Sequence, residues 1–258
     1  MNSGTMDAGL TPSLLMALMI GVASGSIGAF VILRRMALVG DALSHVALPG
    51  IALALYSGRD PFWGVLVSLL GAAPLIWWLE AKSHLPVDAI VGLLFTASLA
   101  IGILTIPDPE LIESLFGVFP ALSPGQLVLT LGSAGVVSVL VFVFAQPFLF
   151  SAVSPELARA RGIGREYDLL LLLLFAFVVA LGIRLVGTLL MGALTIIPAA
   201  IARDVTASMK RYVVLAATLG GGIAVLGVLV SASCTTRPGP TMILLGVILF
   251  LLSLLRQR

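Results

Sequence analysis

Residues 34–50 read RRMALVGDALSHVALPG, and they set two arginines, an aspartate and a histidine within an otherwise apolar segment. Asp41 and His45 are four residues apart, so they share one face of a helix. At ~1.5 Å of rise per residue, His45 lies about 15 Å and Asp41 about 9 Å beyond Arg35. In a hydrocarbon layer ~30 Å thick, His45 is then near the middle, where ionisable groups are costly unless they face a cavity or a partner. The stretch predicts a membrane helix that carries a functional pair.

The composition of the whole chain also predicts a membrane protein. Of its 258 residues, 60% are hydrophobic and 10% are charged, and the mean hydropathy is +1.18. A soluble domain carries about 25% charged residues, so we expect the lipid bilayer around this chain and no nucleic-acid partner. Cys234 is the only cysteine, which excludes an intrachain disulfide and a thiolate metal cluster.

Apolar runs divide the chain into eight or nine predicted spans. Backbone groups in lipid must be satisfied within each segment, which favours helices, so we expect an all-α transmembrane bundle with 1–258 as a single domain. The first run continues to Leu33 and carries no basic segment before it, which favours a span over a signal peptide. The runs are 10–33, 37–57, 61–79, 88–106, 123–150, 168–185, 187–202, 212–232 and 240–255.

The basic residues predict the orientation of the spans. If Arg34 and Arg35 face the cytoplasm, alternation puts eleven of the fourteen Lys and Arg residues on that side. The positive-inside rule favours this arrangement. We therefore expect the N-terminus outside and the C-terminus in the cytoplasm.

Two connections between runs are longer than turns. The outer one, 107–124, is acidic with an apolar centre and has two interpretations, a short helix or an ordinary loop. The inner one is predicted to contain a short basic helix over about 154–164, because it has an N-cap serine, a first-turn proline and glutamate, and a glycine stop. Docking to a partner, or to anionic lipid, suits such a helix. Its residues are Ser154, Pro155, Glu156, Leu157, Ala158, Arg159, Ala160, Arg161 and Gly162.

Three interpretations of Asp41 and His45 remain open from the residues alone. Carboxylate and imidazole bind borderline divalent ions such as zinc, manganese and iron, they relay protons, or they join by a hydrogen bond that stabilises the bundle. Two ligands do not complete a metal site, so other helices or a second copy would have to contribute. Candidates for a polar path or a helix kink beside the pair are Ser44, Pro49, Gly50 and Pro198. His84 lies in a predicted cytoplasmic turn and is expected to be solvated.

The sequence contains no GxxxxGK[ST] segment, so this chain does not hydrolyse ATP by P-loop chemistry. The stretch RRMALVGDALSHVALPGIALAL resembles the signature of the metal-permease family of bacterial ABC importers. Similarity continues through VGLLFTASLAIGIL, ESLFG, SPELARARGI, RLVGTLLMGALTIIPAAIAR and PGPTMILLGVILFLLSLL. It covers nearly all of residues 10–255 in the family's order.

This resemblance implies a permease subunit of a type II ABC importer in the bacterial plasma (inner) membrane. It implies a homodimer bound to two cytoplasmic ATPase subunits and supplied by an extracytoplasmic metal-binding protein. The transported ion would be manganese, zinc or iron, with no permanently bound cofactor. Asp41 and His45 would contact the metal, and 154–164 would be the coupling helix. The alternatives are a proton-coupled secondary metal transporter and an intramembrane metalloenzyme.

Overall fold

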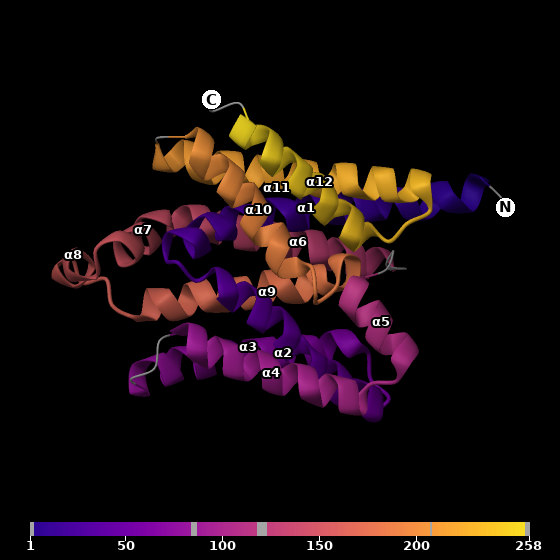
Figure 1. The fold of residues 1–258 in the computed structure, drawn as a ribbon, viewed down its shortest axis with the longest axis horizontal. Helices are drawn as coiled ribbons and strands as arrows, with labels where there is room; N and C mark the ends of the chain where they lie inside the picture. The colour runs from indigo at the N-terminus through magenta and orange to yellow at the C-terminus, as the bar shows by residue number, and fades with distance from the viewer. Residues whose placement is uncertain (1–2, 84–86, 118–122, 207, 256–258) are drawn as a thin grey trace.

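The computed structural model describes residues 3–83, 87–117, 123–206 and 208–255, and within these ranges every regular element is a helix (Figure 1). The all-α prediction is therefore confirmed. The helices are α1 (Ser3–Leu33), α2 (Ala37–Tyr56), α3 (Pro61–Lys82), α4 (Val87–Thr105), α5 (Asp108–Phe116), α6 (Pro124–Val143), α7 (Ala145–Val153), α8 (Pro155–Ala160), α9 (Glu166–Val186), α10 (Met191–Val205), α11 (Met209–Cys234) and α12 (Pro238–Leu255).

Seven of the described helices are long and apolar enough to cross a bilayer, namely α1, α2, α3, α6, α9, α11 and α12. The described apolar part of α4, Ala89–Thr105, is shorter, and α10 has 15 residues. The chain is thus an all-helical polytopic membrane protein with seven to nine candidate spans. The predicted number of eight or nine lies within this range.

Two predicted segments differ from the observed helices, and for a third the structure decides between the two interpretations. The run 123–150 is divided, because α6 ends at Val143 and α7 begins at Ala145 after a break at Phe144. The outer connection does contain a helix, α5, which ends where Gly117 adopts a φ of +70°. The inner basic helix, predicted over 154–164, is shorter: α8 spans Pro155–Ala160 and is followed by a turn with Gly162 at a φ of +73°.

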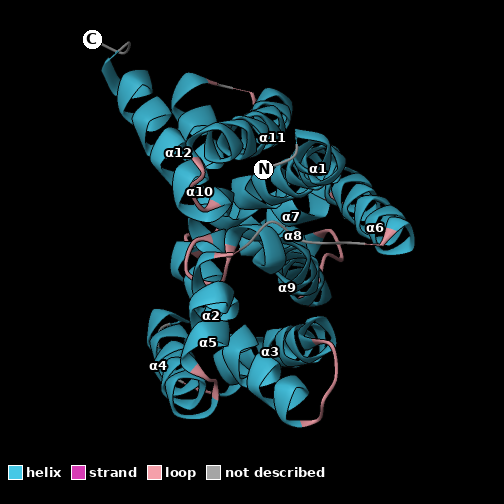
Figure 2. Ribbon diagram, turned by 90° about the vertical axis from the view of Figure 1, so that its right-hand side faces the viewer, coloured by secondary structure: helices cyan, strands magenta, loops and turns pink. Residues whose placement is uncertain are grey.

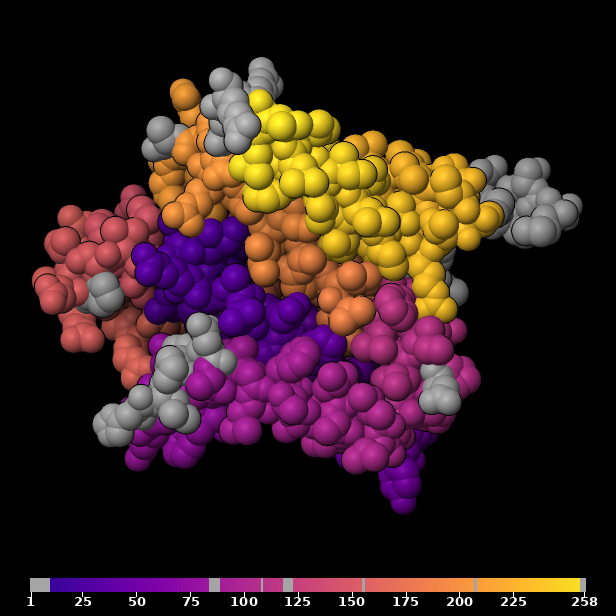
Figure 3. All heavy atoms as spheres, viewed as in Figure 1, coloured from indigo at the N-terminus to yellow at the C-terminus, as the bar shows by residue number. Residues whose placement is uncertain are grey.

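The helices form two groups with α9 between them. In Figure 1, α2, α3 and α4 lie below α9, while α1, α10, α11 and α12 lie above it, and Figure 2 shows the same division from the end. On the face drawn in Figure 3, the magenta surface of α4 and α5 lies below the orange and yellow surface of the C-terminal helices. The apolar stretches of α1 and α9 are 72% buried inside the protein, whereas those of α6 and α12 are 22% buried. The outer helices therefore present their apolar side chains to lipid.

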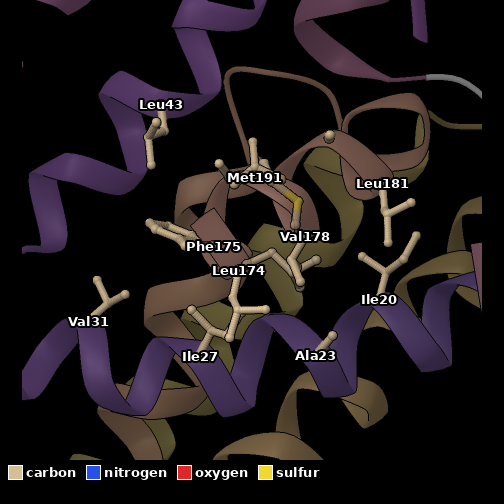
Figure 4. Packing of buried hydrophobic residues seen from close by; sticks show 14 of the residues in the cluster. Ile20, Ala23, Ile27, Val31, Leu43, Leu174, Phe175, Val178, Leu181 and Met191 are labelled. Atoms are coloured by element: carbon tan, nitrogen blue, oxygen red, sulfur yellow. The ribbon is translucent and has the colours of Figure 1, made fainter. Parts of the chain in front are cut away.

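Close packing in the bundle centre depends on small residues as well as on large apolar ones. Side chains of α1, including Ile20 and Ile27, face Leu174 and Val178 of α9 in Figure 4. On its other side, α1 meets α11 where Gly21 and Gly220 face one another, and a Cβ on Gly21 would lie 2.4 Å from the Gly220 carbonyl oxygen. Small residues allow this backbone approach between membrane helices.

Candidate functional site

Asp41 and His45 both lie on α2, as the sequence predicts, and Asp41 borders a cavity of about 170 Å³ between α2 and α4. Asp41 is exposed, although it lies within a helix that is largely buried. The other residues that line the cavity are Leu38, Ala42, Val91, Gly92 and Phe95. The carboxylate is therefore the charged group of an otherwise apolar cavity wall.

His45 is buried beneath the same wall. It is 2% exposed, and its ring meets the ring of Phe95 edge to face, with centroids 4.6 Å apart. Within the described residues, its Nδ1 has no hydrogen-bond partner. A buried polar atom without a partner costs free energy and calls for an explanation such as a ligand site. Phe95 contacts His45 and borders the Asp41 cavity, so one aromatic ring lies beside both polar groups.

The sequence gives no sign of the contact between α2 and α10 at this place. A Cβ on Gly192 would lie 2.7 Å from Asp41 Oδ1 and 3.2 Å from the Asp41 amide nitrogen. Any larger residue at this position would therefore displace the carboxylate and crowd the backbone of α2. Both Gly192 and Phe95 belong to the site, and both were missed because neither carries a polar side chain.

The four residues predicted to form a polar path or a helix kink have different surroundings. The Ser44 hydroxyl donates to the Gly40 carbonyl of its own helix at 2.8 Å and is fully buried. Gly50 packs against Gly64 of α3, since a Cβ on Gly50 would lie 2.2 Å from the Gly64 carbonyl oxygen. Pro49 lies within the continuous α2, and Pro198 lies buried within α10. Among these, Gly50 has a clear packing role between α2 and α3.

The described residues contain no group of three or more His, Cys, Asp and Glu side chains that could hold a metal ion. His84 lies outside those residues. Within the described part of one chain, Asp41 and His45 are thus not joined by a third side chain of these types. A resident structural metal typically requires four ligands.

The short helix α8 lies at the left-hand end of the bundle in Figure 1. The Ser154 hydroxyl accepts a hydrogen bond from the Leu157 amide at 3.4 Å, which confirms the predicted N-cap. Leu157 is 53% exposed, and Glu156, Arg159, Ala160, Arg161 and Gly162 are exposed as well, while Ala158 is buried. The Arg161 guanidinium lies over the Phe150 ring of α7, 4.4 Å from its centroid. The segment therefore presents a mixed apolar and basic surface at one end of the bundle.

Comparison with known proteins identifies the family in which a chain with these features belongs. The family model described as ABC 3 transport family matches residues 6–257. The chain belongs to the ABC 3 transport family. It is the membrane permease subunit of an ABC transporter, separate from the ATPase, and the family resemblance is confirmed.

Similar proteins extend over almost the whole chain. The manganese import system permease protein ScaB of Streptococcus gordonii is 33% identical over 249 residues, 95% of this chain and 90% of that protein. The high-affinity zinc uptake system membrane protein ZnuB of Haemophilus influenzae is 32% identical over 255 residues, 96% and 97% of the two chains. The structure of PsaBC from Streptococcus pneumoniae in complex with Fab has a TM-score of 0.84 and 32% identity, covering 98% of this chain and 95% of that one.

A second solved structure supports the fold alone. A metal-chelate type ABC transporter in an inward-facing conformation is 19% identical, with a TM-score of 0.78 over 95% of this chain and 85% of that one.

Family membership decides against the two alternatives, the proton-coupled secondary transporter and the intramembrane metalloenzyme, because an ABC permease is driven by a partner ATPase.

Proposed function

We propose that this permease imports manganese or zinc into a bacterial cell and that Asp41 and His45 contact the ion midway. The observation that carries the proposal is the pair itself: a carboxylate at a cavity and a buried imidazole with an unpartnered Nδ1, on one face of α2. Carboxylate suits manganese, and imidazole suits zinc. Relatives named for manganese and for zinc import support both, and iron remains a prediction from the sequence.

The pair would replace part of the hydration shell of the ion. An ion in hydrocarbon is costly, so a path needs polar groups at intervals and a wall that excludes lipid. Asp41 offers the exposed charge, His45 offers a deeper nitrogen, and Phe95 closes the wall between them.

The finer assembly is part of the same proposal. Two copies of the chain, with a type II importer permease fold, would bind two cytoplasmic ATPase subunits and receive metal from an extracytoplasmic binding protein. The incomplete ligand set within the described part of one chain supports a dimer in which each copy contributes. The eleven-to-three distribution of basic residues supports an N-terminus outside and a C-terminus inside, in the bacterial inner membrane.

The segment 154–162, with α8 at its centre, is the proposed coupling element. Its exposed residues combine an apolar contact, Leu157, with the guanidinium groups of Arg159 and Arg161. Such a combination suits a protein groove, where an apolar anchor is surrounded by polar groups. Replacing Leu157 by Asp should therefore abolish co-purification of the ATPase subunit, while Lys210→Ala in the first turn of α11 should leave it unchanged.

The experiment for the substrate uses the permease–ATPase complex reconstituted in liposomes with its metal-binding protein. With Mg²⁺-ATP supplied to the ATPase subunits throughout, ATP hydrolysis should rise when Mn²⁺ or Zn²⁺ is given to the metal-binding protein. It should not rise when Ca²⁺ or additional Mg²⁺ is given there, since these ions prefer all-oxygen ligands. Equal stimulation by all four ions would reject a selective Asp–His path. If Fe²⁺ stimulates ATP hydrolysis and none of these four ions does, the imported ion is iron and not manganese or zinc.

A further inference from the structure

Each end of α2 is joined to an end of α9 by an ion pair. At the inner end, Arg34 Nη2 lies 2.9 Å from Asp168 Oδ2. Arg34 precedes α2 in the turn from α1, and Asp168 lies in the first turn of α9. At the outer end, Arg184 in the last turn of α9 donates to Asp60, which follows α2 in the turn to α3. The turns before and after the helix that carries the metal-contacting pair are thus each paired with α9, and the outer one is also the N-cap of α3.

The inner joint also includes the segment that leads to α8. Asp168 accepts a hydrogen bond from the Ser151 hydroxyl of α7, in addition to its ion pair with Arg34. The two side chains of the ion pair are 14% and 15% exposed, so water screens this contact less than a surface pair. Through one carboxylate, α7, α9 and the start of α2 meet, and α8 follows α7 after Ser154 alone.

The turn at this joint has an unusual backbone. Arg35 adopts a φ of +57°, a left-handed conformation that is uncommon for residues other than glycine. Such a conformation persists where the surrounding structure holds it. Here the Arg35 and Met36 amides donate to the Ile32 and Val31 carbonyls at the end of α1, as in a helix C-cap, and the Arg34–Asp168 ion pair joins this ordered turn to α9.

Between the joints, α9 touches α2 beside the candidate site. A Cβ on Gly40 would lie 3.0 Å from Cζ of Phe175, and Figure 4 shows Phe175 on α9 directed toward the α2 side of the core. Gly40 immediately precedes Asp41. A movement of α9 would therefore displace both turns and Gly40, the residue before the carboxylate.

The outer joint is built on a helix cap. Asp60 accepts a hydrogen bond from the Phe62 amide at 2.8 Å, and the Arg184 guanidinium lies over the Phe62 ring, 5.0 Å from its centroid. Partial burial raises the pKa of Asp60, but the Arg184 and Phe62 hydrogen bonds and the Arg184 charge outweigh it and hold the pKa below its ordinary value. The carboxylate is charged at neutral pH, so the joint is present under working conditions.

We infer that Asp168 and Arg184 are positioning residues through which α9 transmits movement of the coupling segment to both ends of α2. This inference rests on the proposed role of 154–162 in ATPase coupling. Packed cores and ion-pair joints switch between discrete arrangements and do not deform continuously. A rigid α9, joined at both membrane faces, would then turn α2 as one body and change the side to which Asp41 and His45 have access.

The test measures how many ATP molecules are hydrolysed for each metal ion imported by the full complex in liposomes, with Mn²⁺ and Zn²⁺ as the ions. Asp168→Asn and Arg34→Gln should each raise this ratio at least fivefold, while subunit assembly and the maximal ATPase rate stay within twofold of wild type. The double variant Arg34→Asp with Asp168→Arg should bring the ratio back toward wild type. A residue with a merely structural role would change yield and stability without changing the ratio.

The matched control is Glu80→Gln. Glu80 pairs with Arg165 at 3.9 Å, near the same end of α9, but it joins α9 to α3 and not to a turn of α2, and its pair is more exposed. Its ratio should equal that of wild type. An equal increase of the ratio in Glu80→Gln would overturn the inference, because the loss of any ion pair at this end of α9 would then have the same effect.

Further outcomes separate this inference from the proposed function. If wild type imports metal with a fixed ratio and the Asp168 and Arg34 variants keep it, the inference is wrong and the proposed function stands. If wild type imports neither ion, both are wrong. Should Asp168→Asn fail to assemble, Asp60→Asn at the more exposed outer joint provides the same test, and an unchanged ratio there overturns the inference.

Discussion

Replacing Gly192 by Ala should weaken metal import specifically through Asp41. The added Cβ would lie 2.7 Å from Asp41 Oδ1, whereas ordinary contact begins at 3.4 Å, so the carboxylate has to move by about 0.7 Å. The Asp41 amide nitrogen, 3.2 Å from the new atom, limits how far α10 can adjust. Overpacking costs about 1–3 kcal/mol, and each ~1.4 kcal/mol is a factor of ten in affinity. If this cost falls on the metal-contacting position, half-maximal import requires about 5- to 150-fold more metal.

The assay is initial import by the reconstituted complex as a function of Mn²⁺ or Zn²⁺ concentration. Gly222→Ala is the matched control, because a Cβ at that position meets nothing within 4 Å, and it should keep the wild-type half-saturation. A Gly192→Ala complex with unchanged half-saturation would refute the assigned contact. An equal loss in Gly222→Ala would show that any added methyl group in the bundle has this effect.

Two further predictions concern stability. Gly220→Ala places a Cβ 2.2 Å from the Gly21 carbonyl oxygen, so α1 and α11 must separate; we expect a loss of about 1–3 kcal/mol, measured as a lower unfolding midpoint in detergent, and no loss in Gly222→Ala. For Asp60 the folded pKa is lowered, so the stabilisation by Arg184 is fully present above the ordinary value of 3.8 and disappears as pH falls through the folded value. The difference in midpoint between wild type and Asp60→Asn should be constant from pH 7 to 5 and shrink below 3.8; a difference that grows on acidification would contradict this sign.

Local signals in the sequence predicted the elements that depend on local chemistry. Asp41 and His45 fall on one helix because charged and turn-forming residues bound the apolar run that contains them. The start of α8 follows from the Ser154 cap and Pro155, since capping depends on neighbours within one turn. Its end was predicted too far along, because a glycine indicates a stop only to within a few residues.

Contacts between helices were beyond the sequence. A membrane helix is apolar on nearly all sides, so its pattern does not tell which face meets which neighbour. Nothing local marks Gly192 as a neighbour of Asp41, or Phe95 as a neighbour of His45. Nor does anything local mark Arg237 as a neighbour of α5, yet its guanidinium donates to the Ile112 carbonyl at 3.2 Å and lies over the Phe116 ring, which joins α5 to the turn before α12.

Four charged residues that the sequence assigns to the two sides of the membrane form ion pairs in the structure. The positive-inside pattern places Arg34 and Asp168 on one side and Asp60 and Arg184 on the other. In the structure these residues pair within each side. The pairing itself could not be predicted, because residues more than a hundred positions apart are brought together only by the packing of α9 against α2.

The most direct measurement of the central claim is metal import by the complete transporter after replacement of Asp41 and His45 by Ala, singly and together. Ser44→Ala is the control, since its hydroxyl bonds only within α2. The account predicts that the double variant assembles with its ATPase and hydrolyses ATP at the basal rate but imports neither Mn²⁺ nor Zn²⁺, while Ser44→Ala imports both. Import at the wild-type rate by the double variant would contradict it.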